Sequence, residues 1–190
     1  MFTGIIKKTA KVLKAEKKNG GMILAVERPN GWKIALGNSI AVDGACLTVA
    51  SLSKKEIIFE LTKETLDKTY FGSFFSKFVN LEPALKAGDE LGGHFVLGHI
   101  DCVGKILSVK KEKSGTFVSI SFPKEFSKLA VFKGSIAVDG ISLTIAGKKG
   151  NSFSVCLAPY TLSHTYIASK GALDKVNLEF DILGKYIMNK

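Results

Sequence analysis

With 190 residues, of which 46% are hydrophobic, the chain is long enough for one domain or for two small domains that each bury a core. Its formal net charge of +10 suggests nucleic-acid binding, but Arg28 is the one arginine among 27 basic residues, and base readout favours the planar fork of arginine. The lysines are scattered along the chain, which indicates a solvated surface rather than a nucleic-acid-binding stripe.

The N-terminal residues 1–5 have no charged region before an apolar run, and no run in the chain reaches the roughly 18 apolar residues of a membrane span. We therefore expect a soluble cytoplasmic protein that does not associate with a membrane. Apolar residues from Ile5 onward predict a strand within residues 1–15 that begins almost at the first residue. Residues 18–21, Lys-Asn-Gly-Gly, predict a hairpin turn, because Asn and Gly tolerate positive φ.

The rest of the first half reads as short strands separated by turns. The predicted elements are strands at 22–27, 39–42, 46–52, 56–61 and 78–81, a tight turn at Asp43-Gly44 and a short helical turn at 62–66. The second half repeats these pieces in the same order. There, Ser114-Gly115 is predicted to replace the first hairpin turn, and residues 147–150 to replace the lysine turn after the fourth strand.

The clearest feature of the chain is a segment that it carries twice. Residues 39–48, SIAVDGACLT, return as residues 135–144, SIAVDGISLT, with eight of ten positions identical. The constant offset of 96 positions predicts two similar halves. Cys46 in the first copy corresponds to Ser142 in the second, so the repeat changes at its one reactive group.

Six short strands per half with little helix predict an all-β fold of two tandem six-stranded antiparallel barrels, since closure removes exposed edges. The predicted domains are residues 1–90, residues 91–180 and a C-terminal oligomerisation helix at 181–190. Asp181 is expected to cap that helix, whose apolar stripe is Ile182, Leu183, Tyr186 and Ile187. We expect the stripe to dock on another subunit; the alternative is that it packs on its own barrel.

Two of the three histidines, His94 and His99, lie in the glycine-rich approach to the second half. Their spacing of five fits neither one strand face nor one helix face, which argues against a shared metal. Imidazole titrates near neutral pH, so acid or base chemistry is the better functional interpretation. For His94 alone we expect a structural role, and for His164 simple exposure.

Three widely spaced cysteines predict neither a disulfide framework nor a zinc site. Cys46 starts a strand near a predicted barrel mouth, where it can meet a ligand or be an inert buried thiol. Cys102 and Cys156 are expected in the core. Hydroxyl and other polar groups recur at matched positions of the two halves, which predicts two equivalent pockets for a planar heterocycle; these pairs are Thr48 with Thr144, Lys63 with Tyr160 and Thr65 with Thr161.

The N-terminal MFTGI, the doubled segment, Gly92-Gly93-His94 and Gly98-His99-Ile100 together resemble the riboflavin synthase family of the alpha-chain type. The resemblance covers essentially the whole chain. It implies two Greek-key barrels, a homotrimer made with the C-terminal helix, no metal and no added cofactor, and lumazine synthase as a partner. The family reaction is a dismutation, in which one 6,7-dimethyl-8-ribityllumazine gives a four-carbon unit to another. Riboflavin and 5-amino-6-ribitylamino-pyrimidinedione leave.

The resemblance implies a set of site residues. Cys46, His99 and Ser142 are the expected catalytic groups, and Phe2 and Asp181 are expected near the site shared between subunits. The expected first-barrel pocket comprises Gly4, Ile5, Ile6, Cys46, Leu47, Thr48, Glu60, Leu61, Thr62, Lys63, Glu64 and Thr65. The expected second-barrel pocket comprises Gly98, His99, Ile100, Ser142, Leu143, Thr144, Leu157, Ala158, Pro159, Tyr160, Thr161 and Leu162, with Lys133 reaching a ligand shared between subunits.

Two positions depart from the family pattern: Ala45 stands where some relatives have a second Cys, and Tyr160 where an acidic residue is common. The alternative function is a non-catalytic lumazine- or flavin-binding antenna protein, whose second-barrel site residues we would expect to be lost. Here His99, Ser142 and Thr144 are present. A nucleic-acid-binding barrel is a distant third, because the chain lacks a recognisable aromatic stacking platform.

Overall fold

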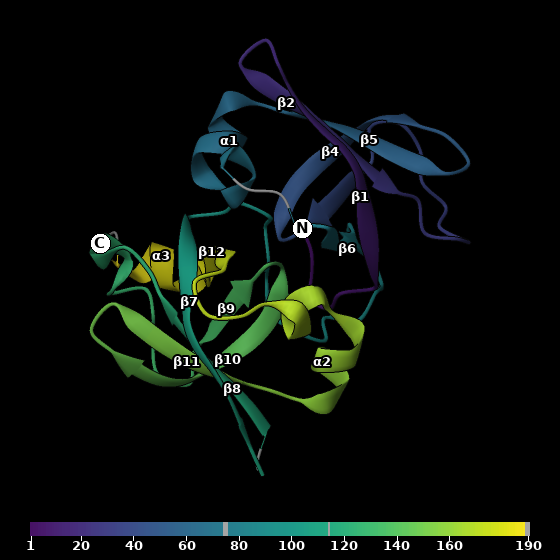
Figure 1. Ribbon diagram of the computed structural model, residues 1–190. Helices are drawn as coiled ribbons and strands as arrows, with labels where there is room; N and C mark the ends of the chain where they lie inside the picture. Colours follow the sequence, from purple (N-terminus) through teal and green to yellow (C-terminus); the bar gives the residue numbers. More distant parts are fainter. Residues whose placement is uncertain (74–75, 114, 189–190) are drawn as a thin grey trace.

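The computed structural model describes residues 1–73, 76–113 and 115–188, and it contains two closed six-stranded antiparallel barrels (Figure 1). The first barrel, purple to blue, lies above the second, green to yellow, and the N-terminus lies between them. The predicted all-β double barrel is thus confirmed. Ser114 of the predicted turn and positions 189–190 of the predicted helix lie outside the described residues.

The first barrel has the strand order β1-β2-β5-β4-β3-β6. A short α-helix and a 3-10 turn connect β5 to β6 (Figure 1). Its elements are β1 Lys8–Lys18, β2 Gly21–Glu27, β3 Ser39–Val42, β4 Ala45–Leu52, β5 Glu56–Leu61, α1 Lys63–Lys68, η1 Tyr70–Gly72 and β6 Phe78–Pro83.

The second barrel has the order β10-β11-β8-β7-β12-β9, which is the same arrangement under the repeat. A C-terminal helix follows its last strand. Its elements are β7 Cys102–Glu112, β8 Gly115–Ser121, η2 Lys124–Phe126, β9 Ser135–Val138, β10 Ile141–Lys149, β11 Ser152–Leu157, α2 Pro159–His164, η3 Tyr166–Ser169, β12 Lys175–Phe180 and α3 Ile182–Met188.

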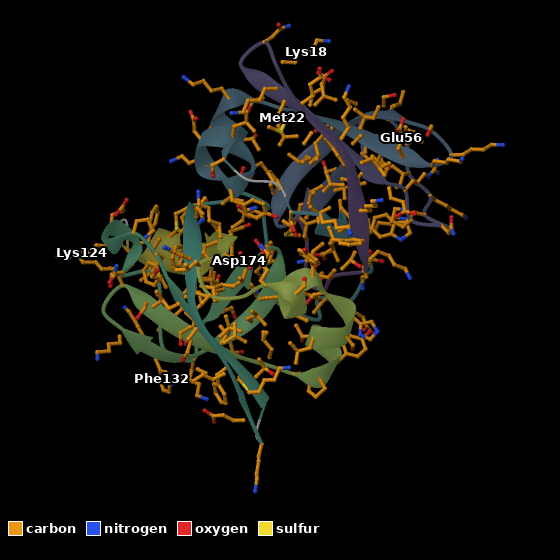
Figure 2. The ribbon with its side chains drawn as sticks, viewed as in Figure 1. Lys18, Met22, Glu56, Lys124, Phe132 and Asp174 are labelled. Carbon is orange, nitrogen blue, oxygen red and sulfur yellow. The ribbon has the colours of Figure 1, made fainter. Side chains whose placement is uncertain are left out.

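Alternation of apolar and polar residues places one face of each strand in a barrel interior. In β5, Ile57, Phe59 and Leu61 are buried, and in β11 the matching residues Phe153, Val155 and Leu157 are buried. A side chain of this size contributes about 1.5–3 kcal/mol when it is fully buried. Figure 2 shows the same division, with Met22 directed into the first barrel and Lys18 projecting from the tip of the β1–β2 hairpin.

The duplicated segment forms the seam between the barrels. Its Asp-Gly turns have positive φ at Asp43, Gly44, Asp139 and Gly140, and a Cβ on Gly44 would lie only 2.7 Å from the Gly140 nitrogen. Both aspartates are 1% exposed. The sequence predicted the turns correctly but not that they meet each other at the centre of the molecule.

Hydrogen bonds tie the seam together in a reciprocal pattern. The side-chain amide of Asn80 donates to the Asp139 carbonyl (3.1 Å), and that of Asn177 donates to the Asp43 carbonyl (3.0 Å). The Asp43 carboxylate also accepts a hydrogen bond from the Tyr70 hydroxyl. These buried bonds join residues 59 and 134 positions apart in sequence, so they hold one barrel against the other.

The chemical symmetry of the seam is broken by Lys170. Its Nζ lies 2.5 Å from Asp139 Oδ2 and 4.6 Å from the centroid of the Tyr70 ring. Burial disfavours its charge, but Asp139 and Asp43 outweigh that penalty and hold the pKa of Lys170 above its ordinary value. Burial, and then the Asp139 carboxylate, raises the pKa of Asp43 to about 7.

Three local predictions need correction. The first strand begins at Lys8, because residues 2–6 leave the barrel and cross toward the other one. Strand β10 continues through Lys149 past an irregularity between Ile145 and Gly147, so the turn follows Lys149 rather than starting at residue 147. Cys102 is buried as expected, whereas Cys156 is exposed, because it faces outward in the alternation of β11.

The C-terminal helix α3 begins as predicted, with Asp181 Oδ1 accepting a hydrogen bond from the Leu183 amide (3.0 Å). Its Lys185 forms a 2.7 Å ion pair with Asp101, which attaches the helix to its own barrel. The apolar residues Leu183, Tyr186 and Ile187 remain 59–74% exposed. None of the helices within the described ranges has the length and apolar composition that crossing a bilayer requires.

Candidate functional site

Two extended segments, arm 1 (residues 2–6) and arm 2 (residues 94–100), meet between the barrels. The Phe2 amide donates to the Val96 carbonyl (2.7 Å), and the Val96 amide donates back to the Phe2 carbonyl (3.1 Å). Phe2 and Val96 are completely buried and pack with Ala41 and Ala137, which lie on the two copies of the repeated segment. The aromatic ring of Phe2 therefore fills the space between the barrels.

Each arm is anchored by a glutamate of its own barrel. Glu82 accepts hydrogen bonds from the Thr3 amide and hydroxyl (both 2.7 Å) and from the Gly4 amide (3.0 Å). Glu179 accepts them from the amides of Leu97 (2.7 Å) and Gly98 (2.9 Å). Burial raises the pKa of both carboxyls, that of Glu179 to about 7, because the opposing hydrogen bonds only partly offset the loss of solvent.

From these anchors, each arm reaches the reactive position of the other barrel. The Gly4 carbonyl accepts a hydrogen bond from the Ser142 amide (2.8 Å), and the Gly98 carbonyl accepts one from the Cys46 amide (2.9 Å). Both glycines have positive φ, and a Cβ would lie 2.5 Å from Ser142 Cβ at Gly4 and 2.4 Å from Cys46 Cβ at Gly98. Only glycine fits these two contacts.

This exchange corrects the predicted grouping of the site residues. The sequence assigned Gly4, Ile5 and Ile6 to the first-barrel pocket, but arm 1 lies against Ser142, and Ile6 packs on the core of the second barrel. The sequence assigned Gly98, His99 and Ile100 to the second-barrel pocket, but arm 2 lies against Cys46, and Ile100 packs on the first core. The repeat gives both arms the same motif, and that motif does not reveal which barrel each arm contacts.

The two reactive positions have equivalent backbone settings and different chemistry. Cys46 and Ser142 are each the second residue of a strand, β4 and β10, and both are half-buried. The Ser142 hydroxyl lies 2.7 Å from His94 Nδ1. Within the described ranges the Cys46 thiol has no hydrogen-bond partner; His99, on arm 2, is exposed. The histidine beside Ser142 is therefore His94 and not His99.

The structure accordingly gives His94 a contact that the sequence did not predict. In the sequence, the glycines before His94 were the one sign of a close contact here. The structure shows the reason, because a Cβ on Gly93 would lie 2.9 Å from Ser142 Oγ. His94 is 9% exposed, and its Nε2 has no hydrogen-bond partner in the described chain. Burial lowers the pKa of His94, and the negative charge of Asp181 partly opposes that shift.

The remaining predicted pocket residues follow from barrel topology. Strand β4 pairs with β5, which carries Glu60 and Leu61. Helix α1 follows directly, and the Thr62 hydroxyl at its start accepts a hydrogen bond from the Thr65 amide (3.2 Å). In the second barrel, β10 pairs with β11, which ends at Leu157 before α2. Thr48 and Thr144 are exposed opposite Ser39 and Ser135, and Tyr160 and Lys133 are also exposed.

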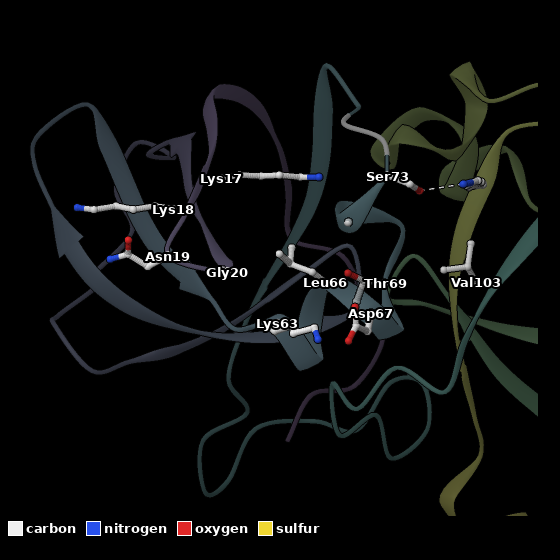
Figure 3. A pocket seen from close by; sticks show the side chains of 13 residues that line it. Lys17, Lys18, Asn19, Gly20, Lys63, Leu66, Asp67, Thr69, Ser73 and Val103 are labelled. Carbon is white, nitrogen blue, oxygen red and sulfur yellow. Dashed lines mark hydrogen bonds between the residues drawn. The ribbon is translucent and has the colours of Figure 1, made fainter.

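Two cavities lie on the surface away from the reactive positions. One, of about 660 Å³, spans the β1–β2 hairpin, α1 and the edge of the second barrel, and its lysines are Lys17, Lys18, Lys63 and Lys175 (Figure 3). The other, of about 900 Å³, lies beside Trp32 and Glu82. Among the described residues, neither cavity is lined by Cys46 or Ser142. Of the predicted pocket residues, all of which the structure describes, Lys63 lines the first cavity and none lines the second.

Comparison with known proteins agrees with this architecture. The profile of the lumazine binding domain family matches residues 3–84 and 97–181. Riboflavin synthase of Actinobacillus pleuropneumoniae is 38% identical over 189 residues, which cover 98% of this chain and 88% of that protein. Riboflavin synthase of Brucella abortus is 39% identical over 193 residues, which cover 98% of this chain and 96% of that protein.

Solved structures share the fold. The crystal structure of LumP complexed with riboflavin matches with a TM-score of 0.87 and 23% identity, covering 95% of this chain and 99% of that chain. LumP complexed with 6,7-dimethyl-8-(1'-D-ribityl) lumazine matches with a TM-score of 0.85 and 22% identity, covering 94% and 98%. At this identity the likeness concerns the fold alone.

Proposed function

This chain belongs to the lumazine-binding family of riboflavin synthases and is a transferase, and on that premise we propose that it converts two molecules of 6,7-dimethyl-8-ribityllumazine into riboflavin and 5-amino-6-ribitylamino-pyrimidinedione. One substrate molecule donates a four-carbon unit and the other accepts it. The observation that carries the proposal is the pair of crossed arms, which builds two sites with the same backbone and different reactive groups.

A reaction between two copies of one molecule benefits from two sites of this kind. Equivalent backbone groups can hold the same heterocycle twice, whereas Cys46 and Ser142 give the two copies different chemical surroundings. Holding both reactants in one orientation makes the encounter effectively unimolecular, and this can supply several kcal/mol of the barrier, on the order of 7–11 in well-oriented systems. The repeat and its single chemical difference thus both contribute to the proposed reaction.

The two sites of one chain lie on opposite barrels, so the proposal includes a site shared between subunits. In it, the first barrel of one subunit faces the second barrel of the next, with Lys133, Phe2 and Asp181 near the joint. The exposed apolar residues of α3 support association into a homotrimer, because a soluble monomer gains nothing from a solvated stripe of Leu183, Tyr186 and Ile187. Three expectations from the sequence remain predictions: binding to lumazine synthase, the domain bounds at residues 90 and 180, and a cytoplasmic location.

In the proposed mechanism, a nucleophile adds to the electrophilic carbon of one lumazine at the Cys46 site. That nucleophile is either the Cys46 thiolate or a water molecule that Cys46 helps to position. A ring methyl group of the other lumazine loses a proton with the assistance of His99 or Ser142, and the resulting anion is delocalised over the ring. His99, on the arm beside Cys46, and Ser142 remain the proposed catalytic groups together with Cys46.

Replacing Cys46 by Ser tests the nucleophile. We expect C46S to lower kcat far more than it weakens lumazine binding, because the side chains are similar in size but the hydroxyl is a much weaker nucleophile. The matched control is Cys156→Ser, an exposed cysteine on the outer face of β11. Equal turnover of C46S and the wild type would remove Cys46 from the mechanism.

The alternative is a non-catalytic lumazine- or flavin-binding antenna protein; LumP, which shares the fold, was solved in complex with riboflavin and with 6,7-dimethyl-8-(1'-D-ribityl) lumazine. One experiment separates the two functions: the purified protein is mixed with 6,7-dimethyl-8-ribityllumazine, and riboflavin is followed by its absorbance. Binding with a fluorescence change but without riboflavin would establish the antenna function. No binding at all would exclude both.

A further inference from the structure

The contact between His94 and Ser142 is specific to one of the two reactive positions. His94 is held by its backbone, since its amide donates to the Thr3 carbonyl (3.1 Å) and Val96, two residues on, is paired with Phe2. Its Nδ1 lies 2.7 Å from Ser142 Oγ. At the other position, the corresponding Cys46 thiol has no such partner in the described chain. The two sites therefore differ in two ways: one has Cys46 and the other Ser142, and, in the part of the chain that the structure describes, an imidazole lies within hydrogen-bond distance of Ser142 alone of the two.

The surroundings of the imidazole favour the neutral state that a proton acceptor needs. His94 is largely removed from water, which favours its neutral form, and Asp181 is the charged group that acts on it. A neutral imidazole carries one N–H and one free lone pair. If Nε2 holds the hydrogen, the Nδ1 lone pair faces the Ser142 hydroxyl, and the nearby carboxylate of Asp181 stabilises the imidazolium that forms.

We propose that His94 is a positioning residue that accepts a proton through Ser142, so that the Ser142 site is where the ring methyl group of the bound lumazine is deprotonated. The proposal rests on the proposed function and assigns the base of that reaction. It explains why the repeat changes at this position, because a thiol and a hydroxyl coupled to imidazole suit different tasks. It also gives Gly93 a role, since any side chain there would occupy the space of Ser142.

The proton and electron count of the step closes without any co-reactant. The methyl C–H bond breaks, and its electron pair stays on the lumazine, where the ring delocalises it. The methyl proton goes to Ser142 Oγ as the hydroxyl proton moves to His94 Nδ1. The imidazolium later returns that proton by the same route when a group on the intermediate is protonated, which regenerates the neutral pair.

The test uses two substitutions of His94 in the full-length protein. In His94→Asn, a side-chain atom takes the place of Nδ1 and keeps a hydrogen bond to Ser142, but it cannot accept a proton at neutral pH. His94→Gln removes that hydrogen bond as well. His164→Gln is the control, because His164 is exposed on α2. If His94→Gln unfolds, the comparison of His94→Asn with Ser142→Ala still decides the question.

Two readouts are used. The first is riboflavin formation at several pH values; the second is exchange of the ring methyl protons of 6,7-dimethyl-8-ribityllumazine with D2O, followed by NMR and corrected for the exchange without protein. We expect His94→Asn to lower kcat and the protein-dependent exchange rate by about 10²- to 10⁴-fold with little change in lumazine affinity. The wild-type rate should fall on the acid side as His94 becomes protonated, and this acid limb should disappear in His94→Asn.

The double variant His94→Asn/Ser142→Ala should be no slower than the slower single variant, because the two residues act as a unit. Unchanged exchange in His94→Asn, or a loss of rate that matches a loss of binding or stability, would overturn the proposal. Protein-dependent exchange that needs His94 but yields no riboflavin would support the base and refute the proposed function. Riboflavin formation that is unaffected in His94→Asn would do the reverse.

Discussion

Replacing Gly98 by Ala tests whether the crossed arms hold the Cys46 site together. Gly98 has φ +82, where an L-residue costs about 1–2 kcal/mol. Its new Cβ would also lie 2.4 Å from Cys46 Cβ and 2.8 Å from the Cys46 nitrogen, and backbone there cannot move aside easily. If arm 2 shifts, the 2.9 Å bond from the Cys46 amide is lost, and a buried donor left unpaired costs about 1–3 kcal/mol.

The two costs together predict that G98A loses on the order of 2–5 kcal/mol of stability. Gly31→Ala is the matched control, because Gly31 has φ +78 and no heavy atom within 4 Å of the added Cβ, so it should lose only the backbone share, about 1–2 kcal/mol. Thermal unfolding measures the difference, at roughly 2–4 °C of Tm per kcal/mol for a chain of this size. Equal losses in the two variants would refute the tight contact between arm 2 and β4.

Three further predictions concern the seam and the anchors. Phe2→Ala should destabilise the protein by about 3–5 kcal/mol and reduce riboflavin formation, because a fully buried ring between the barrels is removed; a wild-type Tm would show that Phe2 is not packed there. Lys170→Met should cost about 3–5 kcal/mol by leaving buried Asp139 unpaired, and adding Asp139→Asn should recover part of it; no recovery in the double variant would count against the ion pair. Glu179 has a pKa raised to about 7, so the folded state holds a proton that the unfolded state releases near pH 4.5, and stability should fall as pH rises from about 4.5 to 7. Glu179→Gln should be less stable than the wild type at every pH, since its side-chain NH2 faces a backbone amide donor. Its loss of stability between about pH 4.5 and 7 should nevertheless be smaller than that of the wild type, by on the order of 2 kcal/mol. Stability measured by urea unfolding that falls in parallel with pH for the two proteins would contradict the raised pKa.

The seam explains why the central residues of the repeated segment, 40–45 and 136–141, are buried. Asp43 and Asp139 lie at the contact between the barrels, and each carboxylate accepts a hydrogen bond from the backbone amide of Asn80 or Asn177 in its own barrel. Because the asparagine side chains then cross to the other barrel, a change at any of these positions affects both barrels. The barrels should therefore unfold together rather than one after the other.

The sequence by itself determined the number and kind of the barrels. An offset of 96 residues between two nearly identical segments requires two similar halves, and turn residues such as Asn19-Gly20 and Asp43-Gly44 set the hairpins that the structure contains. These features are local: φ preference and alternating burial act over a few residues. Strand bounds such as Glu56–Leu61 were predictable for the same reason.

Only the tertiary structure decided which groups meet. The exchange of the arms pairs Gly4 with Ser142 and Gly98 with Cys46, although the repeat alone would keep each arm with its own barrel. The pairing of the two arms, in which the His94 amide donates to the Thr3 carbonyl next to Gly4, brings His94 to Ser142, a contact between residues 48 positions apart. Such contacts depend on how the two folded barrels pack against each other and on which buried polar groups require hydrogen-bond partners. No pattern within either half records that packing.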